Sequence, residues 1–408
     1  MPLRQGPRWL RNGVHKRIPS RARPCYTTQR DSRFPAQQAL AHGRRCSPPT
    51  TRSDVECSHS RQETRMDVLT ALSEKSEYST TKLQMILAAW VLSTPFERSA
   101  KVSLENGRVE EEDYDKQSIY SLLYSLYRSM GVVRSDTGEP YKLTFNTWGY
   151  TWPATWDTSA TPDSDPQRFG KNAYTGLFQF PSVKDYVSQR DGRVHVVEMG
   201  CGTGAGAHHV CKTVLPKCTY EAIDMQQAAI RTCQQEFVPE LDHRLVATRA
   251  DCTEVPIEDG TADIVAVCET HVTEIAGKVL EEDRQFFTKV QSILKTGGFL
   301  VWGNAIPDKT WQPCLDYLAS IGMKLVESHD VTAEAIAARD QDEARVDAYV
   351  EQCLERFLAF RIPVFGPRKR AEAEIALKNF YRNPGTNLYV DMENGTDSYK
   401  VVLLEKTA

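Results

Sequence analysis

The stretch that most constrains this chain is an apolar run that leads into a glycine-rich turn. Residues 193–200 (RVHVVEMG) form a β-branched run typical of a strand buried on both faces of a sheet. Glycines then alternate at Gly200, Gly202 and Gly204, and a helical pattern begins at His208. Because open α/β sheets bind ligands at the carboxyl ends of their strands, this order predicts a ligand site at the turn.

The same alternation of strand and helix continues towards the C-terminus, which predicts a doubly wound α/β sheet. Further strands are expected at 219–225, 245–251, 262–269, 299–304, 323–331 and 398–406. Helices are expected at 208–215, 226–237, 281–298 and 310–322. The 65 residues 332–396, between the last two strands, have helical patterns. We expect this insertion to form a cap over one end of the sheet.

The glycine turn alone leaves its ligand open. A phosphate-binding P-loop is excluded, because no lysine follows the glycines. A dinucleotide turn stays possible, since Gly202, Gly204 and Ala207 satisfy the looser G-x-G-x-x-A pattern. A nicotinamide-dependent dehydrogenase is therefore an alternative.

Acidic residues near the turn narrow the choice. Glu198 precedes the first glycine by two residues, Asp224 ends the second strand and Asp251 ends the third. Carboxylates at these places can accept hydrogen bonds from an amine, from two ribose hydroxyls and from the adenine amine. The turn 294–298 (LKTGG) leads into strand five, and a last strand that comes from the chain's end suits insertion between strands five and six.

Together these motifs resemble the class I S-adenosylmethionine-dependent methyltransferases, over about 193–331 and 397–408. The resemblance implies a Rossmann-like seven-stranded sheet and S-adenosylmethionine as cofactor. It implies that Glu198 and the turn amides bind the methionine part, Asp224 the ribose, and Asp251 with Cys252 the adenine. The complete set of expected cofactor-binding residues is Glu198, Gly200, Gly202, Gly204, Asp224, Met225, Asp251, Cys252 and Glu269.

The substrate is expected over the ends of strands four and five. His271 follows strand four, as a catalytic histidine does in plant and antibiotic-type O-methyltransferases, although its neighbours here differ from theirs. It is either a general base or a group that only orients the substrate. The expected substrate contacts are Arg168, Tyr174, Trp302 and Asn304.

A narrower resemblance concerns the overall layout of residues 80–406. It includes E-T-H-V-T-E after strand four and W-G-N-A-I-P after strand five. This layout is similar to the eukaryotic branch (DSYB) of the methylthiohydroxybutyrate S-methyltransferases of dimethylsulfoniopropionate synthesis. The resemblance implies methyl transfer to the thioether sulfur of the carboxylate 4-methylthio-2-hydroxybutyrate. An O- or N-methyltransferase of secondary metabolism, with His271 as base, is the alternative.

The N-terminal part differs in charge from the rest of the chain. Residues 1–52 carry eleven arginines, one lysine and one acid, whereas the remainder holds 38 basic and 53 acidic residues. The segment 1–60 is typical of a transit peptide to the mitochondrion or chloroplast, with a basic arm for nucleic acid or membrane as the alternative. The acidic body opposes nucleic-acid binding.

Between the basic segment 1–60, called the head below, and the sheet we expect a helical N-terminal domain, 65–165, that covers the substrate and forms a homodimer. The methyltransferase core is expected at 166–331 and the last strand at 397–408. No metal site is expected, because the eleven cysteines contain no C-x-x-C pair, and no membrane span, because the longest apolar run, Met85–Leu92, is short. Arsenic methylation would use thiols such as Cys201, Cys252 and Cys268, and is a remote alternative.

Overall fold

The structure is a computed structural model that describes residues 123–124, 126–128, 130–156, 161–270, 279–356 and 366–407. All of them belong to one compact unit of the chain. The basic head and most of the segment predicted as a helical domain lie outside the described residues. So does His271.

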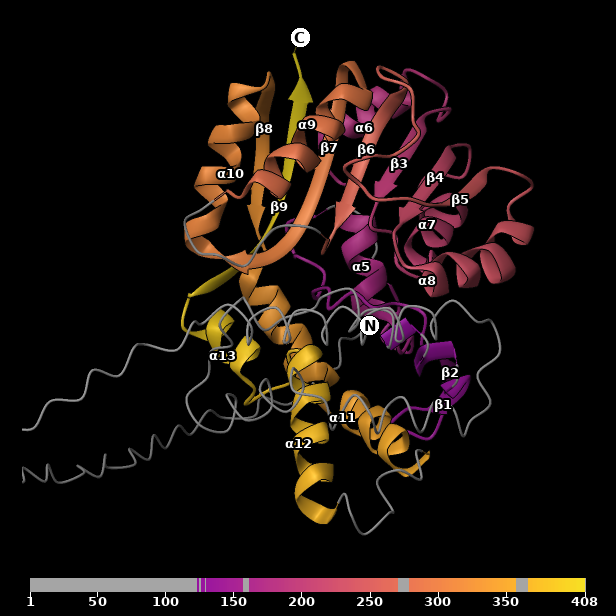
Figure 1. Cartoon of the computed structure of the whole chain (residues 1–408), viewed down its shortest axis with the longest axis vertical. Helices are drawn as coiled ribbons and strands as arrows, with labels where there is room; N and C mark the ends of the chain where they lie inside the picture. The colour runs from indigo at the N-terminus through magenta and orange to yellow at the C-terminus, as the bar shows by residue number, and fades with distance from the viewer. Residues whose placement is uncertain are drawn as a thin grey trace, which may run out of the picture. The chain divides into compact units, whose positions relative to one another are not determined.

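A seven-stranded sheet forms the centre of this unit (Figure 1). Its strand order is β5-β4-β3-β6-β7-β9-β8. The strands are β3 (His195–Met199), β4 (Thr219–Asp224), β5 (Leu245–Arg249), β6 (Ala262–Cys268), β7 (Leu294–Pro307), β8 (Met323–Asp330) and β9 (Asp397–Lys406). All seven predicted strands are present, and the predicted fold class is confirmed.

The last strand enters the sheet between its two predecessors. β9 pairs antiparallel with both β7 and β8, whereas β3, β4, β5, β6 and β7 pair in parallel. This is the insertion between strands five and six that the sequence predicts. Because the parallel strands run in one direction, their carboxyl ends meet at one edge of the sheet.

One predicted boundary is wrong. The sequence places residues 294–298 at the end of a helix, but α9 (Glu281–Ile293) stops earlier and β7 begins at Leu294. Leu294 pairs with Ala262, and the register shifts before Ile264 pairs with Phe299. The glycines of the LKTGG turn therefore bend the strand at this irregularity.

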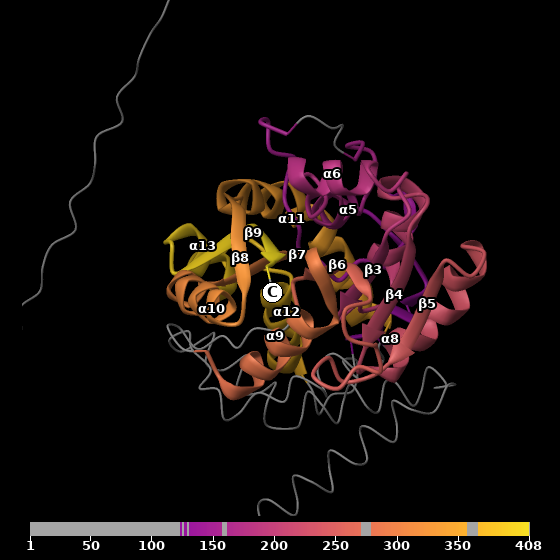
Figure 2. The same ribbon diagram turned by 90° about the horizontal axis from the view of Figure 1, so that it is seen from above.

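Helices cover both faces of the sheet (Figure 2). The helices α5 (Arg168–Gly176), α6 (Pro181–Ser188) and α7 (Ala205–His209) pack on one face, and α9 and α10 (Asp308–Ser320) on the other. Side chains of a buried strand alternate between the two cores, so Val301 joins the first core and Trp302 the second. The helix α8 (Gln227–Thr232) follows β4.

A third core lies at the carboxyl edge of the sheet and joins distant parts of the chain. It packs Tyr124 and Tyr127 against Tyr349 and Tyr381. The elements around it are the hairpin β1 (Val132–Arg134) and β2 (Pro140–Lys142), and the helices α11 (Thr332–Arg356) and α12 (Gly366–Phe380) of the insertion (Figure 1). The helix α13 (Asn387–Glu393) leads into β9.

The described part of the predicted N-terminal domain is helical only at its start. From residue 132 it forms the hairpin, and residues 143–152 then have neither helix nor strand. The sequence did not predict this hairpin, whose strands have only three residues each. Among the described helices, none is long and apolar enough to cross a membrane.

The Trp302 side chain gives a test of the second core. It is fully buried, and its ring lies 5.3 Å from that of Phe287 and 4.5 Å from that of Trp311. We expect Trp302→Ala to lower the free energy of unfolding in urea by about 3–5 kcal/mol, because it leaves a cavity. Val132→Ala, at an exposed position, should change it by less than about 0.5 kcal/mol. An equal, small effect of both variants would contradict the assignment.

Candidate functional site

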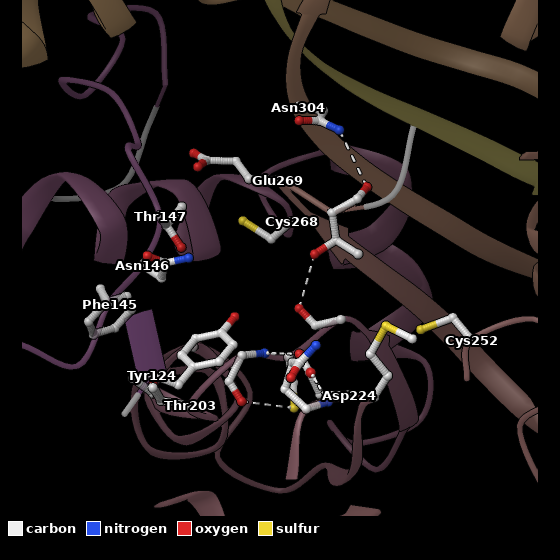
Figure 3. A pocket seen from close by; sticks show the side chains of 18 of the residues that line it. Tyr124, Phe145, Asn146, Thr147, Thr203, Asp224, Cys252, Cys268, Glu269 and Asn304 are labelled. Carbon is white, nitrogen blue, oxygen red and sulfur yellow. Dashed lines mark hydrogen bonds between the residues drawn. The ribbon is translucent and has the colours of Figure 1, made fainter. Parts of the chain in front are cut away.

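A cavity of about 580 Å³ opens at the carboxyl ends of the parallel strands (Figure 3). One part of its wall is the glycine turn, the carboxyl ends of β4, β6 and β7, and the residues that follow β4, β5 and β6. The opposite part is the segment Thr144–Trp148, which precedes α5. Tyr124 and Tyr174 complete the wall between them.

The glycine turn is held close to its neighbours. The backbone amides of Gly200 and Cys201 both donate to the Ile223 carbonyl at 2.8 Å, which ties the turn to β4. Gly200 has a φ of +80°, and a side chain there would lie 2.1 Å from Thr270. Only glycine combines this backbone with this approach. The Thr270 hydroxyl donates to the Gly200 carbonyl at 3.1 Å and so joins the turn to the end of β6.

Asp224 faces the cavity from the end of β4. Its carboxylate accepts hydrogen bonds from the Gly202 and Gln226 amides, both at 2.8 Å. Burial raises its pKa to about 6. A carboxylate has about four acceptor positions, so two remain for donors in the cavity.

The end of β5 supplies the outer part of the cavity. Asp251 is exposed, and its carboxylate accepts from the Thr253 amide and hydroxyl at 2.8 Å. Cys252 and the half-exposed Met225 lie beside it on the wall. Together they leave an apolar slot with an acceptor at its rim.

Glu198 is fully buried and is not among the residues that line the cavity, so its expected contact with the cofactor stays a prediction. Its carboxylate accepts from the Tyr174 hydroxyl at 2.7 Å and from the Tyr220 hydroxyl at 3.0 Å. Like Val196, Glu198 points to the α5 face of the sheet, because alternate residues of a strand share a face. Tyr174 does line the cavity, so Glu198 acts through it.

Glu269 has a strained backbone and a half-buried carboxylate. Its φ is +49°, a rare value for a residue other than glycine. The carboxylate accepts from the amides of Trp148 (2.8 Å) and Gly149 (2.9 Å) and from the Tyr399 hydroxyl (2.8 Å). Figure 3 shows it turned towards the segment that carries Asn146 and Thr147. Burial raises its pKa, while these three donors lower it.

Trp148 is held from several sides. Its carbonyl accepts from Arg339, its indole nitrogen donates to the Phe380 carbonyl at 2.7 Å, and the Arg382 guanidinium lies 4.3 Å from its ring centre. Arg339 and Arg382 are buried and come from the insertion and its end. The insertion therefore fixes one wall of the cavity.

The comparisons with known proteins identify the central part of the chain. A family model described as a methyltransferase domain matches residues 196–298, which contain the glycine turn, Asp224 and Asp251. This chain is an S-adenosylmethionine-dependent methyltransferase. Its cofactor is S-adenosylmethionine, and the acceptors left open around the glycine turn fit that molecule's hydroxyls and amines.

Curated relatives of this methyltransferase are distant. A phthiotriol/phenolphthiotriol dimycocerosates methyltransferase of Mycobacterium tuberculosis is 24% identical over 267 residues, which cover 65% of this chain and 86% of the relative. A fatty-acid O-methyltransferase of Mycolicibacterium smegmatis is 22% identical and covers 44% and 62%. Geranyl diphosphate C-methyltransferase of Streptomyces coelicolor A3(2), a solved structure, has a TM-score of 0.44 and 11% identity, covering 77% of this chain and 98% of that one.

The expected substrate residues of the methyltransferase meet different outcomes. Tyr174 and Asn304 line the cavity. Asn304 already bonds to the Thr270 carbonyl at 3.3 Å and to the Ala305 amide at 2.9 Å. Trp302 does not line the cavity; it is fully buried in the second core, where its ring packs against those of Phe287 and Trp311.

Arg168 also does not line the cavity, so its expected substrate contact stays a prediction. Its guanidinium stacks 4.1 Å from the Phe169 ring centre and faces Asp163 at 4.0 Å. As the first residue of α5, it starts the helix at the end remote from Tyr174. His271 lies outside the described residues, and its two predicted roles stay open.

Three cysteines on the cavity wall are kept as neutral thiols. Burial raises the pKa of Cys201 and Cys268 well above the usual value, and that of Cys252 to about 12. Because the thiolate is the reactive form, this weighs against the arsenic alternative. Among the described residues, no group of three or more metal-binding side chains is present.

The region 65–165 was expected to cover the substrate, but sequence reasoning did not single out Asn146 and Thr147 or the partners of Glu198. The segment 144–148 has neither helix nor strand, and no periodic pattern places its individual side chains at the cavity. Tyr220 is paired in register with Val196, so its hydroxyl reaches Glu198 only across the assembled sheet. An acid flanked by two distant tyrosines has no local sequence signal.

The buried Glu198 predicts a dependence of stability on pH. Burial raises its pKa from an ordinary 4.5 to about 7, so the folded protein holds a proton that the unfolded chain releases. Stability contributed by this proton is present below pH 4.5 and is lost as the pH rises to about 7. In the absence of cofactor, the free energy of unfolding of Glu198→Gln should therefore fall less over this pH range than that of the wild type, by up to about 3 kcal/mol.

The measurement is urea unfolding between pH 4.5 and 8. The tyrosine hydroxyls can still bond to the glutamine amide, so the variant should fold. Glu258→Gln, at an exposed site, is the control and should keep the wild-type slope. An unchanged slope in Glu198→Gln would show that Glu198 does not cause it.

Proposed function

We propose that this methyltransferase transfers the methyl group of S-adenosylmethionine to the thioether sulfur of a small carboxylate, 4-methylthio-2-hydroxybutyrate. One observation carries the proposal: Glu269 and Cys268, which line the cavity at the end of β6, are not available as bases. The Glu269 oxygens accept three hydrogen bonds, and burial keeps Cys268 a thiol. A thioether sulfur has no proton to lose, so it needs no base. The resemblance of the layout over 80–406 supports the same substrate.

The charge on the cavity wall also supports this choice. Among the described residues that line it are no lysine, arginine or histidine, whereas Asp224, Asp251, Glu269 and Glu282 are acidic. The cofactor brings an electrophilic methyl group on a cationic sulfonium, and the proposed product is again a sulfonium. A wall of carboxylates and neutral groups tolerates this positive charge before and after transfer.

The residues that hold the cofactor follow from the geometry. We infer that the two open acceptor positions of Asp224 bind the ribose hydroxyls, and that the backbone around Gly200 and Gly202 lies against the methionine part. Asp251, Cys252 and Met225 receive the adenine in the slot at the end of β5. Glu198 fixes Tyr174, and Glu269 fixes the opposite wall.

What these residues contribute to the reaction is alignment. Tyr124 of the third core and the segment 144–148 line the cavity opposite the strand ends, and a cover of this kind helps to exclude water when a ligand is bound. Holding nucleophile and methyl group in line is worth up to about 7–11 kcal/mol in well-oriented cases. On this proposal His271 orients the substrate.

An alternative has support from the relatives. Two groups of them carry names of lipid methyltransferases, and one is named as an O-methyltransferase. On this alternative the acceptor is a hydroxyl or amine of a lipid or secondary metabolite, and His271 removes its proton.

We further propose that residues 1–60 are a transit peptide to the mitochondrion or chloroplast, and that the protein is a homodimer. The charge of the head supports the first and the N-terminal helical pattern the second. N-terminal sequencing of the protein purified from its own cell, and its mass in solution, test them.

Asp224 gives a test of the cofactor site. We expect Asp224→Ala to weaken binding of S-adenosylhomocysteine by about 10- to 100-fold, because it removes a buried charged acceptor. Asp251→Ala should weaken it less, since Asp251 is exposed to water. Calorimetric titration measures both. A larger loss in Asp251→Ala would contradict the assignment of the ribose to Asp224.

The substrate is tested with a panel of acceptors and detection of products by mass spectrometry. We expect methylation of 4-methylthio-2-hydroxybutyrate, with fatty acids, hydroxylated aromatics and amines as the competing acceptors. No turnover of the thioether, with turnover of a hydroxyl or amine, would overturn the proposal in favour of the alternative.

His271→Ala separates the two roles of the histidine. If it only orients the substrate, KM should rise while kcat falls little. A fall in kcat of about 100-fold or more, reversed partly at high pH, would show that it acts as a base.

A further inference from the structure

A chain of hydrogen bonds connects the insertion to the cavity wall. The Tyr381 hydroxyl, just after α12, donates to the Tyr127 hydroxyl at 2.8 Å. The Tyr127 hydroxyl donates in turn to the Asn146 Oδ1 atom. Asn146 lines the cavity, whereas Tyr127 and Tyr381 lie in the third core.

This chain fixes the orientation of the Asn146 amide. The Tyr127 oxygen accepts from Tyr381, so its single proton is directed at Asn146. The amide oxygen must therefore face Tyr127, and the amide nitrogen must face the other way. In Figure 3 this nitrogen points towards the cavity.

Two hydrogen-bond donors at the cavity therefore have no acceptor among the described residues. No hydrogen bond joins the Asn146 Nδ2 atom, or the neighbouring Thr147 hydroxyl, to another described residue. An amide nitrogen offers two donors and no acceptor. A ligand at this place must offer an acceptor oxygen.

We propose that Asn146, assisted by Thr147, binds a carboxylate in the cavity, and that Tyr127 and Tyr381 are positioning residues for it. Both the cofactor and the proposed substrate carry one carboxylate, so the same chemistry has two sources. If the carboxylate belongs to the substrate, the inference rests on the proposed function; if it belongs to the cofactor, it does not. Neutral donors take this role because the described wall has no cation.

Tyr349 provides a matched control for the relay. Its ring lies 6.4 Å from that of Tyr127 and 5.8 Å from that of Tyr381, in the same buried cluster. Its hydroxyl is not a member of the chain to Asn146. Tyr349→Phe and Tyr127→Phe therefore remove the same atom from the same core, but only the second releases the Asn146 amide.

The first experiment measures ligand binding by the full chain. Asn146→Asp keeps the acceptor for Tyr127 and replaces the donor by a carboxylate oxygen. The probes are S-adenosylhomocysteine, which carries the amino-acid carboxylate, and 5′-methylthioadenosine, which lacks it. If the cofactor supplies the carboxylate, Asn146→Asp weakens the first by about 10- to 100-fold and leaves the second unchanged.

The second experiment measures kinetics with whichever acceptor the wild type methylates in the substrate panel. If the acceptor supplies the carboxylate, Asn146→Asp raises its KM by a similar factor and leaves binding of S-adenosylhomocysteine unchanged. Tyr127→Phe should change the same quantity in the same direction by a smaller factor, with kcat retained, and Tyr349→Phe should change neither. Thermal unfolding of each variant checks that it folds.

Two results would overturn the proposal. One is that Asn146→Asp changes both the affinity for S-adenosylhomocysteine and the KM of the acceptor by less than about twofold. The other is an equal loss for S-adenosylhomocysteine and 5′-methylthioadenosine, which does not depend on a carboxylate. If the thioether is not methylated, the proposed function fails. The comparison of S-adenosylhomocysteine with 5′-methylthioadenosine, and the KM of any other acceptor that is methylated, still decide the role of Asn146.

Discussion

The half-buried carboxylate of Glu269 joins the three parts of the chain that enclose the cavity. Glu269 directly follows β6, and its carboxylate accepts from the backbone of Trp148 and Gly149 in the covering segment and from Tyr399 of the last strand. A charge removed from water is unfavourable unless it is fully hydrogen-bonded. Only the assembled structure supplies these donors, so the carboxylate favours the one arrangement in which the segment 144–149 closes over the strand ends.

The cover of the cavity is a shared structure of two distant segments. Tyr124 and Tyr127 come before the sheet, and Tyr349 and Tyr381 come from the insertion before the last strand. All four belong to one apolar cluster, in which the Tyr127 ring packs against that of Tyr349, and the Tyr349 ring against that of Tyr381. The insertion is therefore coupled to the ligand site through packing and through one chain of hydroxyls.

The fold and the cofactor half of the site were predictable because their signals are local. Each parallel strand is a continuous β-branched run, and a glycine turn or an acid marks its end, as at Gly200, Asp224 and Asp251. The directions of individual side chains were not predictable. Glu198 and Trp302 lie on strands that reach the site, but their side chains point to one face or the other according to the register and bends of the sheet.

The sequence by itself determined a seven-stranded α/β sheet and the place of its ligand turn, because hydrophobic periodicity and glycine positions act over a few residues. Tertiary structure alone decided which residues form the opposite wall. Asn146 meets Tyr127 across 19 residues and Tyr127 meets Tyr381 across 254, and Glu269 meets Trp148 across 121. Such contacts depend on how the cover packs on the sheet, and no pattern within a single segment encodes them.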